Sequence, residues 1–338
     1  MAILRFNSLT LACLGLAMLA GCSEERAIGG GVPPSGTGMS SQALNGASAA
    51  SGGASAASGD LLYVTTFEKG RRGPRGVVSI LTFPGGRPVA NIFTAGFGTA
   101  ACSDESGNVW VVVDQHSHWN AYEFAHGGTK PIAKIHIPHP NYASGCAVDP
   151  TTGNLAVLVG IEQGSGPRPA VDVWAGAREG TPAVYPIAFT PFAGAYDDGG
   201  NLFVDGYIGS TVFFEFAELA KGSSSFVNVT LDKRVGFYPG GVQWDGKYIA
   251  LVPGPVRGHS LIYRVKVAGT IGKVVGEVDV EHLSSMAAFS VKDGKVAATT
   301  GAYGGVVTLT PYPAGGRPTK TLARLPFPAG GLAISSSR

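Results

Sequence analysis

The sequence predicts an all-β domain, specifically a six-bladed β-propeller with four-stranded blades. Two observations lead to this prediction. A unit of two short strands joined by a turn recurs along the chain at a nearly constant interval, and the last residues supply a strand that the first unit lacks. Four short strands in each repeat of about 40–50 residues are typical of a propeller blade.

Glycine marks the recurring turns. Each copy has an apolar strand, a turn with Asp and Gly, and a second apolar strand, as in residues 145–157, GCAVDPTTGNLAV. The gaps between the turn glycines are 48, 46, 47, 46 and 48 residues, for Gly59, Gly107, Gly153, Gly200, Gly246 and Gly294. A tight reversal requires positive φ, which glycine adopts at little cost. We therefore expect each glycine at the hairpin between the first and second strands of a blade.

The later half of each unit and the end of the chain complete the pattern. A third strand ends in an aromatic residue, followed by a glycine-bearing turn and a fourth strand, as in residues 80–89 and 309–319. Near the end of the chain, residues 330–335, GGLAIS, form the first strand of a unit that then stops. We expect this C-terminal strand to complete the N-terminal blade and to close the ring, because closure removes open sheet edges. The 280 residues of 59–338 contain about six periods of 47 residues.

The strand–turn–strand copies, above all the one at residues 145–155, resemble the NHL repeat. The domain over residues 59–338 is similar to NHL and SMP-30/gluconolactonase-like propellers. This resemblance implies that the first strand of each blade is innermost and lines a central channel. Propellers support many unrelated functions, so the resemblance implies architecture first.

Composition narrows the classes of partner. Charged residues make up 14% of the chain, against about 25% in a typical domain, and there are 51 glycines. The net charge of +2 is spread without a basic stripe. We therefore expect no nucleic-acid partner.

The N-terminus predicts export. After Arg5, an apolar run from Leu9 to Ala20 is shorter than the roughly 20 residues that span a bilayer, and it has the length of a signal-peptide core. The run ends in residues 19–22, LAGC, which resembles the bacterial lipobox. This resemblance implies a diacylglyceryl group on Cys22, cleavage before it, and acylation by chains such as palmitate. Ser23 is similar to the sorting residue of outer-membrane lipoproteins. The alternative is an ordinary signal peptide with a chance cysteine.

Residues 22–58 predict a flexible tether. They consist mainly of Gly, Ala and Ser with scattered Pro, and such a segment buries too little surface to offset its ordering entropy. Its mean reach is roughly 30–35 Å. The predicted organisation is a signal peptide at 1–21, the lipidated cysteine and tether at 22–58, and the propeller at 59–338. The partners would include the membrane, through the lipid anchor, in the cell envelope.

Two cysteines stay with the folded domain, Cys102 and Cys146. Aligned on the turn residues Asp104 and Asp149, they fall within one position of each other on first strands of consecutive blades. One interpretation is a disulfide between those strands. The other is two separately buried thiols, because successive residues of a strand face opposite ways unless a bulge intervenes.

A second candidate site lies between two strands of one blade. In an extended chain Asp114, His116 and His118 share one face, and such a set can bind zinc or copper. The segment 136–139, HIPH, lies on a neighbouring connection and could add a ligand. The alternative is a polar loop without metal, so a divalent-metal cofactor stays open.

Two functions remain in view. The first, which we favour, is a binding or scaffold module with a protein, glycan or small-molecule ligand on a propeller face. The second is a metal-dependent lactonase-like hydrolase or lyase at the channel mouth. For it, Glu68, Asn141, Asn201 and Asp205 can be assembled as ligands, although no spacing selects them. The four Trp residues are interpreted first as packing between blades and second as a sugar-stacking platform.

Overall fold

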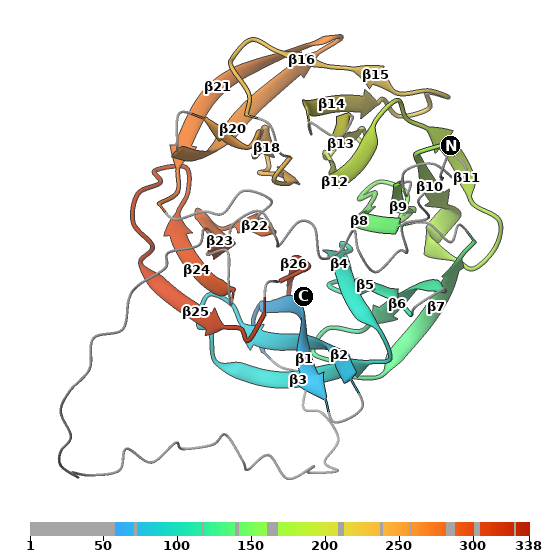
Figure 1. Ribbon diagram of the computed structural model, residues 1–338, viewed down its shortest axis with the longest axis vertical. Helices are drawn as coiled ribbons and strands as arrows, with labels where there is room; N and C mark the ends of the chain where they lie inside the picture. Colours follow the sequence, from blue (N-terminus) through green and yellow to red (C-terminus); the bar gives the residue numbers. More distant parts are fainter. Residues whose placement is uncertain are drawn as a thin grey trace, which may run out of the picture. The chain divides into compact units, whose positions relative to one another are not determined.

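The structure is a computed structural model. It describes residues 58–70, 73–115, 118–138, 142–160, 168–208, 213–236, 239–256, 259–281, 288–300, 305–327 and 329–338. These residues belong to the second of the two units into which the chain divides, Gly53–Arg338. They form six β-sheets around one axis, so the predicted six-bladed propeller is confirmed (Figure 1). In the ranges given above, no helix is long and apolar enough to cross a membrane.

Each blade runs from an innermost strand to an outermost strand. Blade 1 combines β26 (Gly331–Ser335), β1 (Leu61–Gly70), β2 (Gly73–Thr82) and β3 (Pro88–Thr94). Blade 2 has β4 (Phe97–Ser103), β5 (Val109–Asp114), β6 (Trp119–Phe124) and β7 (Pro131–Ile137), and blade 3 has β8 (Tyr142–Val148), β9 (Leu155–Gly160), β10 (Ala170–Trp174) and β11 (Ala183–Pro186). A single-turn 3₁₀ helix, η1 (Ala175–Ala177), follows β10.

The other three blades complete the ring. Blade 4 has β12 (Thr190–Tyr196), β13 (Leu202–Ile208), β14 (Phe213–Leu219) and β15 (Val227–Asn228). Blade 5 has β17 (Val242–Trp244), β18 (Ile249–Leu251), β20 (His259–Ala268) and β21 (Ile271–Asp279), and blade 6 has β22 (Phe289–Lys292), β23 (Lys295–Thr300), β24 (Val306–Pro311) and β25 (Lys320–Arg324). Blade 5 departs from the predicted four strands, because β16 (Thr230–Leu231) pairs in parallel with β21 and β19 (Pro255–Val256) pairs with β20.

The two ends of the chain close the ring together. β26 pairs antiparallel with β1 in a register that runs from Leu61 opposite Ser335 to Thr65 opposite Gly331. Beyond the strands, the Ser337 backbone N–H donates to Asp60 Oδ1 at 2.9 Å. The C-terminal strand therefore completes the N-terminal blade, as the sequence predicts.

The predicted turn glycines adopt the conformation that the repeat requires. All six have φ between +67° and +94°. Five of them lie between the first and second strands of a blade, whereas Gly59 only precedes β1, because β26 supplies the first strand of blade 1 from the other end of the chain. Aspartates at the start of these turns accept backbone N–H groups, as Asp104 Oδ1 does from Asn108 at 2.8 Å and Asp149 Oδ1 from Thr151 at 2.8 Å. These turns, and those between third and fourth strands, lie at one end of the ring, which we call the turn end.

Hydrophobic clusters join the blades. Each of the six clusters contains buried residues from two neighbouring blades. Between blades 2 and 3, Trp110 and Trp174 are 1% exposed and Trp119 is 5% exposed, which fits the packing role predicted for tryptophan. Second strands such as β5 are buried along most of their length, since both faces contact neighbouring blades.

Candidate functional site

The innermost strands enclose a central channel that widens toward the turn end. The wider part is a cavity of about 290 Å³, lined by residues of all six blades. It continues into a narrower space of about 70 Å³, whose walls include Ala100, Gly145, Gly240 and Gly330. The lining of this narrower space also includes Phe192 and Phe289, and the larger polar side chains gather at the turn end.

Polar groups from five blades converge on the wider cavity. They are Glu105 of blade 2, Tyr196 of blade 4, Gln243 of blade 5, Lys292 of blade 6 and Ser336, which follows β26. Lys292 is already paired, because its Nζ lies 3.0 Å from Asp60 Oδ2 and donates to Ser336 Oγ at 2.5 Å.

Three of the residues that line the cavity make no side-chain hydrogen bond to protein within the described ranges. They are Glu105, whose carboxylate is exposed to solvent, and the half-buried Tyr196 and Gln243; the ring of Tyr196 also packs against the cluster between blades 3 and 4. Burial raises the pKa of the Tyr196 hydroxyl, and the nearby Asp149 carboxylate adds to the rise, so the hydroxyl remains a donor at neutral pH. The cavity therefore offers donors and acceptors to a bound molecule.

Trp244 forms part of the cavity wall and differs from the other three Trp residues. It packs against the cluster between blades 4 and 5, but its Nε1 atom is buried and has no hydrogen-bond partner in the described part of the chain. A buried N–H without a partner costs about 1–3 kcal/mol, so such groups are uncommon in folded proteins.

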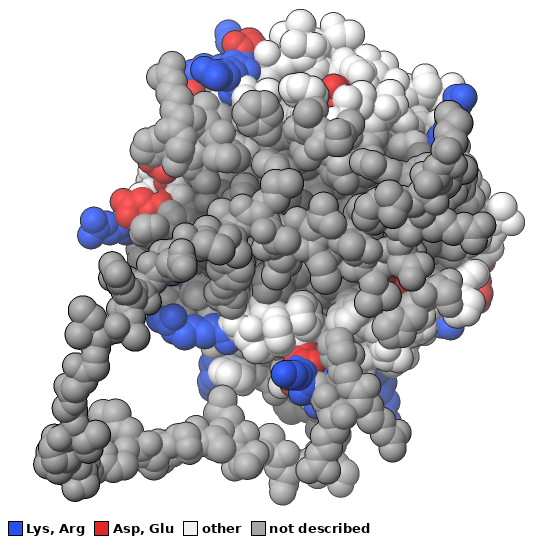
Figure 2. Space-filling view, viewed as in Figure 1, with Lys and Arg blue, Asp and Glu red and all other residues white. Residues whose placement is uncertain are grey.

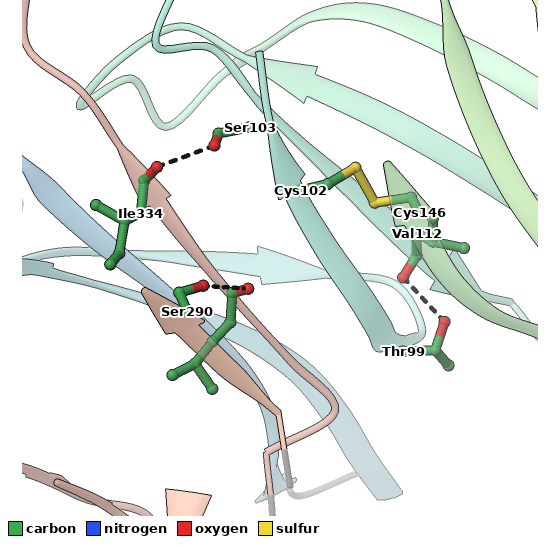
Figure 3. The surroundings of a disulfide bond; sticks show 8 residues. Thr99, Cys102, Ser103, Val112, Cys146, Ser290 and Ile334 are labelled. Atoms are coloured by element: carbon green, nitrogen blue, oxygen red, sulfur yellow. Dashed lines mark hydrogen bonds between the residues drawn. A yellow bond between two sulfur atoms is a disulfide. The ribbon is translucent and has the colours of Figure 1, made fainter. Parts of the chain in front are cut away.

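A disulfide lies in the channel wall beside the cavity. Cys102 of β4 and Cys146 of β8 are bonded, with their Cα atoms 5.8 Å apart (Figure 3). Both cysteines pack with the cluster between blades 2 and 3, from opposite sides of that seam. Nearby, serine hydroxyls tie neighbouring inner strands together, since Ser103 Oγ donates to Ile334 O at 2.9 Å and Ser290 Oγ donates to Leu332 O at 3.2 Å.

Two members of the predicted Asp–His set, Asp114 and His118, lie on different faces of blade 2. Asp114 ends β5 and pairs directly with Trp119, so these two side chains lie on the same face of blade 2. His118 immediately precedes Trp119 and therefore leaves from the other face, where its ring centre lies 6.5 Å from that of His136. Asp114 and His118 therefore leave from opposite faces of the blade, because β5 and β6 pair antiparallel and do not continue as one extended strand. His116 lies outside the described residues.

The residues assembled for a lactonase-like site are also dispersed. Glu68 pairs with Arg75 near the end of β1 that is remote from the turn end, whereas Asn201 lies in the turn before β13. Asp205 is buried within blade 4, and Asn141 lies outside the described residues. In the described ranges, no group of three or more His, Cys, Asp and Glu side chains is arranged to hold a metal ion.

Asp205 instead joins blades 4 and 5. Its Oδ1 accepts the backbone N–H of Ala193 at 2.8 Å, and its Oδ2 accepts that of Gly241, on the next blade, at 3.1 Å. Burial raises the pKa of the Asp205 carboxyl to about 7, although the backbone donors favour its charged form.

The cavity residues were not predicted from the sequence, although five of them share one position in the repeat. The residue immediately before each turn aspartate lines the cavity in five copies, namely Ser103, Val148, Tyr196, Trp244 and Lys292. Polar and aromatic residues at this position are the unusual members of otherwise apolar strands.

Comparison with solved structures supports the fold alone. A Bacteroides caccae protein of unknown function superposes with a TM-score of 0.57 at 12% identity, covering 83% of this chain and 100% of that one. TolB from Acinetobacter baumannii gives 0.55 at 14%, covering 83% and 67%, and a putative TolB from Agrobacterium tumefaciens gives 0.53 at 13%, covering 83% and 98%. No family model matches the chain, and no curated protein matches its sequence.

Proposed function

We propose that the protein is a membrane-tethered binding module that takes a small, neutral, hydroxylated molecule into the cavity at the turn end of its channel. The observation that carries this proposal is the convergence of Glu105, Tyr196 and Gln243 on one cavity without protein hydrogen-bond partners. Polar groups of this kind are normally satisfied by protein or water, and a ligand rich in hydroxyls satisfies them equally well.

The chemistry of the cavity favours this ligand class. Gln243 supplies an amide that both donates and accepts, Tyr196 supplies a hydroxyl, and Glu105 accepts two or more hydrogen bonds. The ammonium group of Lys292 is paired with Asp60, so among the described residues that line the cavity no unpaired cation selects an anionic ligand. A volume of about 290 Å³ is near the lower end for ligand sites, which suits a molecule the size of one sugar ring.

The tether is proposed on the lipobox at residues 19–22 and the Gly/Ala/Ser composition of residues 22–58. The chain enters the propeller at the turn end, where the carbonyl of Gly59 lies 3.2 Å from His126 Nε2. The anchor would hold the module in the cell envelope of a bacterium, with the tether leaving from the end of the ring that carries the cavity.

Ligand titration with a matched pair of variants tests the proposal. We expect saturation-transfer NMR with a panel of neutral monosaccharides to show binding to the wild-type chain, and Gln243→Leu to abolish it. Lys247→Ala is the control, because Lys247 is exposed on the next turn of the same blade and does not line the cavity. If no monosaccharide binds, or if Gln243→Leu binds as tightly as the control, the proposal is wrong.

A further inference from the structure

Two exposed histidines lie close together on one face of blade 2. His118 precedes β6, His136 is on β7, and their ring centres are 6.5 Å apart with an interplanar angle of 58°. In the register of these strands, His136 pairs directly with Asn120, two residues after His118. Residues two apart on a strand share a face, so all three side chains lie on the same side of the blade.

Asn120 brings an oxygen atom to the same place. The residue is only 3% exposed, and its Oδ1 atom has no hydrogen-bond partner within the described ranges. Its orientation is set by a chain of hydrogen bonds, in which Asn120 Nδ2 donates to Gln115 Oε1 at 3.1 Å and Gln115 Nε2 donates to Tyr122 Oη at 3.1 Å. This arrangement uses the donor side of the amide and leaves the acceptor side open.

We propose that His118 and His136 bind one divalent late transition metal ion, Zn²⁺ or Cu²⁺, with Asn120 Oδ1 as a third ligand. Imidazole nitrogen is a preferred ligand of both ions, and Mg²⁺ and Ca²⁺ prefer sites built from oxygen. We therefore expect this site to bind neither Ca²⁺ nor Mg²⁺.

The distance between the two histidine rings is close to the distance that coordination of one ion requires. A metal–nitrogen bond of about 2.0–2.1 Å places each imidazole centre roughly 3 Å from the ion, so two coordinated rings lie about 5–6 Å apart. The observed separation of 6.5 Å therefore needs a closure of about 1 Å, which small side-chain rotations of two exposed histidines provide. This pair differs from the predicted set, because Asp114 lies on the opposite face and takes no part.

Metal titration of the full chain, purified in detergent without an affinity tag, tests the site. We expect isothermal titration with ZnCl₂ and with CuCl₂ to show one site, and MgCl₂ to show none. His118→Ala and His136→Ala should each weaken binding by roughly tenfold or more, and the double variant should abolish it. Because both histidines are exposed, the melting temperature of these variants in the absence of metal should equal that of the wild type.

Two further variants make the assignment specific. Lys134→Ala is the matched control, since Lys134 is exposed on β7 and lies on the same face as His136, and it should leave the affinity unchanged. Asn120→Asp should raise the affinity, because a carboxylate is a stronger metal ligand than an amide. The site is refuted if the wild type binds neither ion or if either histidine variant retains full affinity. Unchanged affinity in Asn120→Asp would overturn the oxygen ligand.

Discussion

Replacing Asp205 with Asn tests how blades 4 and 5 are held together. The carboxylate receives one backbone N–H from Ala193 and one from Gly241, and the side chain is fully buried. Asparagine keeps the shape but turns one acceptor into a donor, so one of these N–H groups loses its partner. At pH 8, where the wild-type carboxyl is charged, leaving one buried N–H unpaired should lower the free energy of unfolding by about 1–3 kcal/mol.

The same carboxyl predicts a pH dependence whose sign follows from its pKa. Burial raises that pKa from the ordinary value of 3.8 to about 7 in the folded state. Between pH 4 and 7 the folded protein therefore binds more protons than the unfolded chain, and the contribution of Asp205 to stability falls as the pH rises through this window. The complete fall is about 4 kcal/mol, from roughly three pKa units at about 1.4 kcal/mol each.

Urea unfolding followed by tryptophan fluorescence at pH 5 and pH 8 measures both effects. Asp205→Asn carries no titrating proton, so its loss of stability relative to wild type should be about 3 kcal/mol larger at pH 5 than at pH 8. The exposed Asp198→Asn is the matched control and should change the unfolding free energy little at either pH. A loss for Asp205→Asn that is the same at both pH values would refute the reasoning.

Three other outcomes are expected. Cys22→Ser should release the protein from the membrane or leave an unprocessed precursor, and a processed, detergent-requiring variant in membrane fractionation would contradict the lipid anchor. Deleting residues 330–338 removes β26 and exposes two sheet edges, so we expect aggregation or a large drop in melting temperature, and a monomer with unchanged melting would contradict ring closure. Intact-mass measurement after alkylation should find Cys102 and Cys146 blocked until reductant is added, and a loop of 44 residues predicts a loss of about 4 kcal/mol when the bond is removed.

The fold was predictable because a turn glycine recurs at a nearly constant spacing and marks the repeating unit in the sequence. A glycine with positive φ is required at each reversal, and the terminal strand has only one place to pair, so spacing and chain ends sufficed for blade number and closure. Blade 5 was not predictable in the same way. Its extra strand β16 comes from the short segment after β15, and pairing over two residues leaves no periodic pattern in the sequence.

The cysteine pairing could not be decided from alternation along one strand, because it depends on how neighbouring blades face each other. Equivalent residues of consecutive blades point in the same direction around the ring, so two equivalent side chains cannot meet across a seam. Cys102 faces forward to blade 3 and Cys146 faces back to blade 2, and the offset of one position gives them opposite faces. The offset that argued against a disulfide on a single strand is therefore what a bond between neighbouring blades requires.

The candidate sites were less predictable because they depend on convergence rather than on motifs. Tyr196, Gln243 and Lys292 are separated by 47 and 49 residues in sequence, and only ring closure brings them to one cavity. For Asp114 and His118, the antiparallel pairing of β5 with β6 places on opposite faces two side chains that an extended chain would place on one face.

The pairing of β26 with β1 also bears on how the protein is made. The residues synthesised last complete the blade that is synthesised first. A chain emerging from N- to C-terminus can therefore assemble most of its hairpins early, but its ring stays open until the final segment is available.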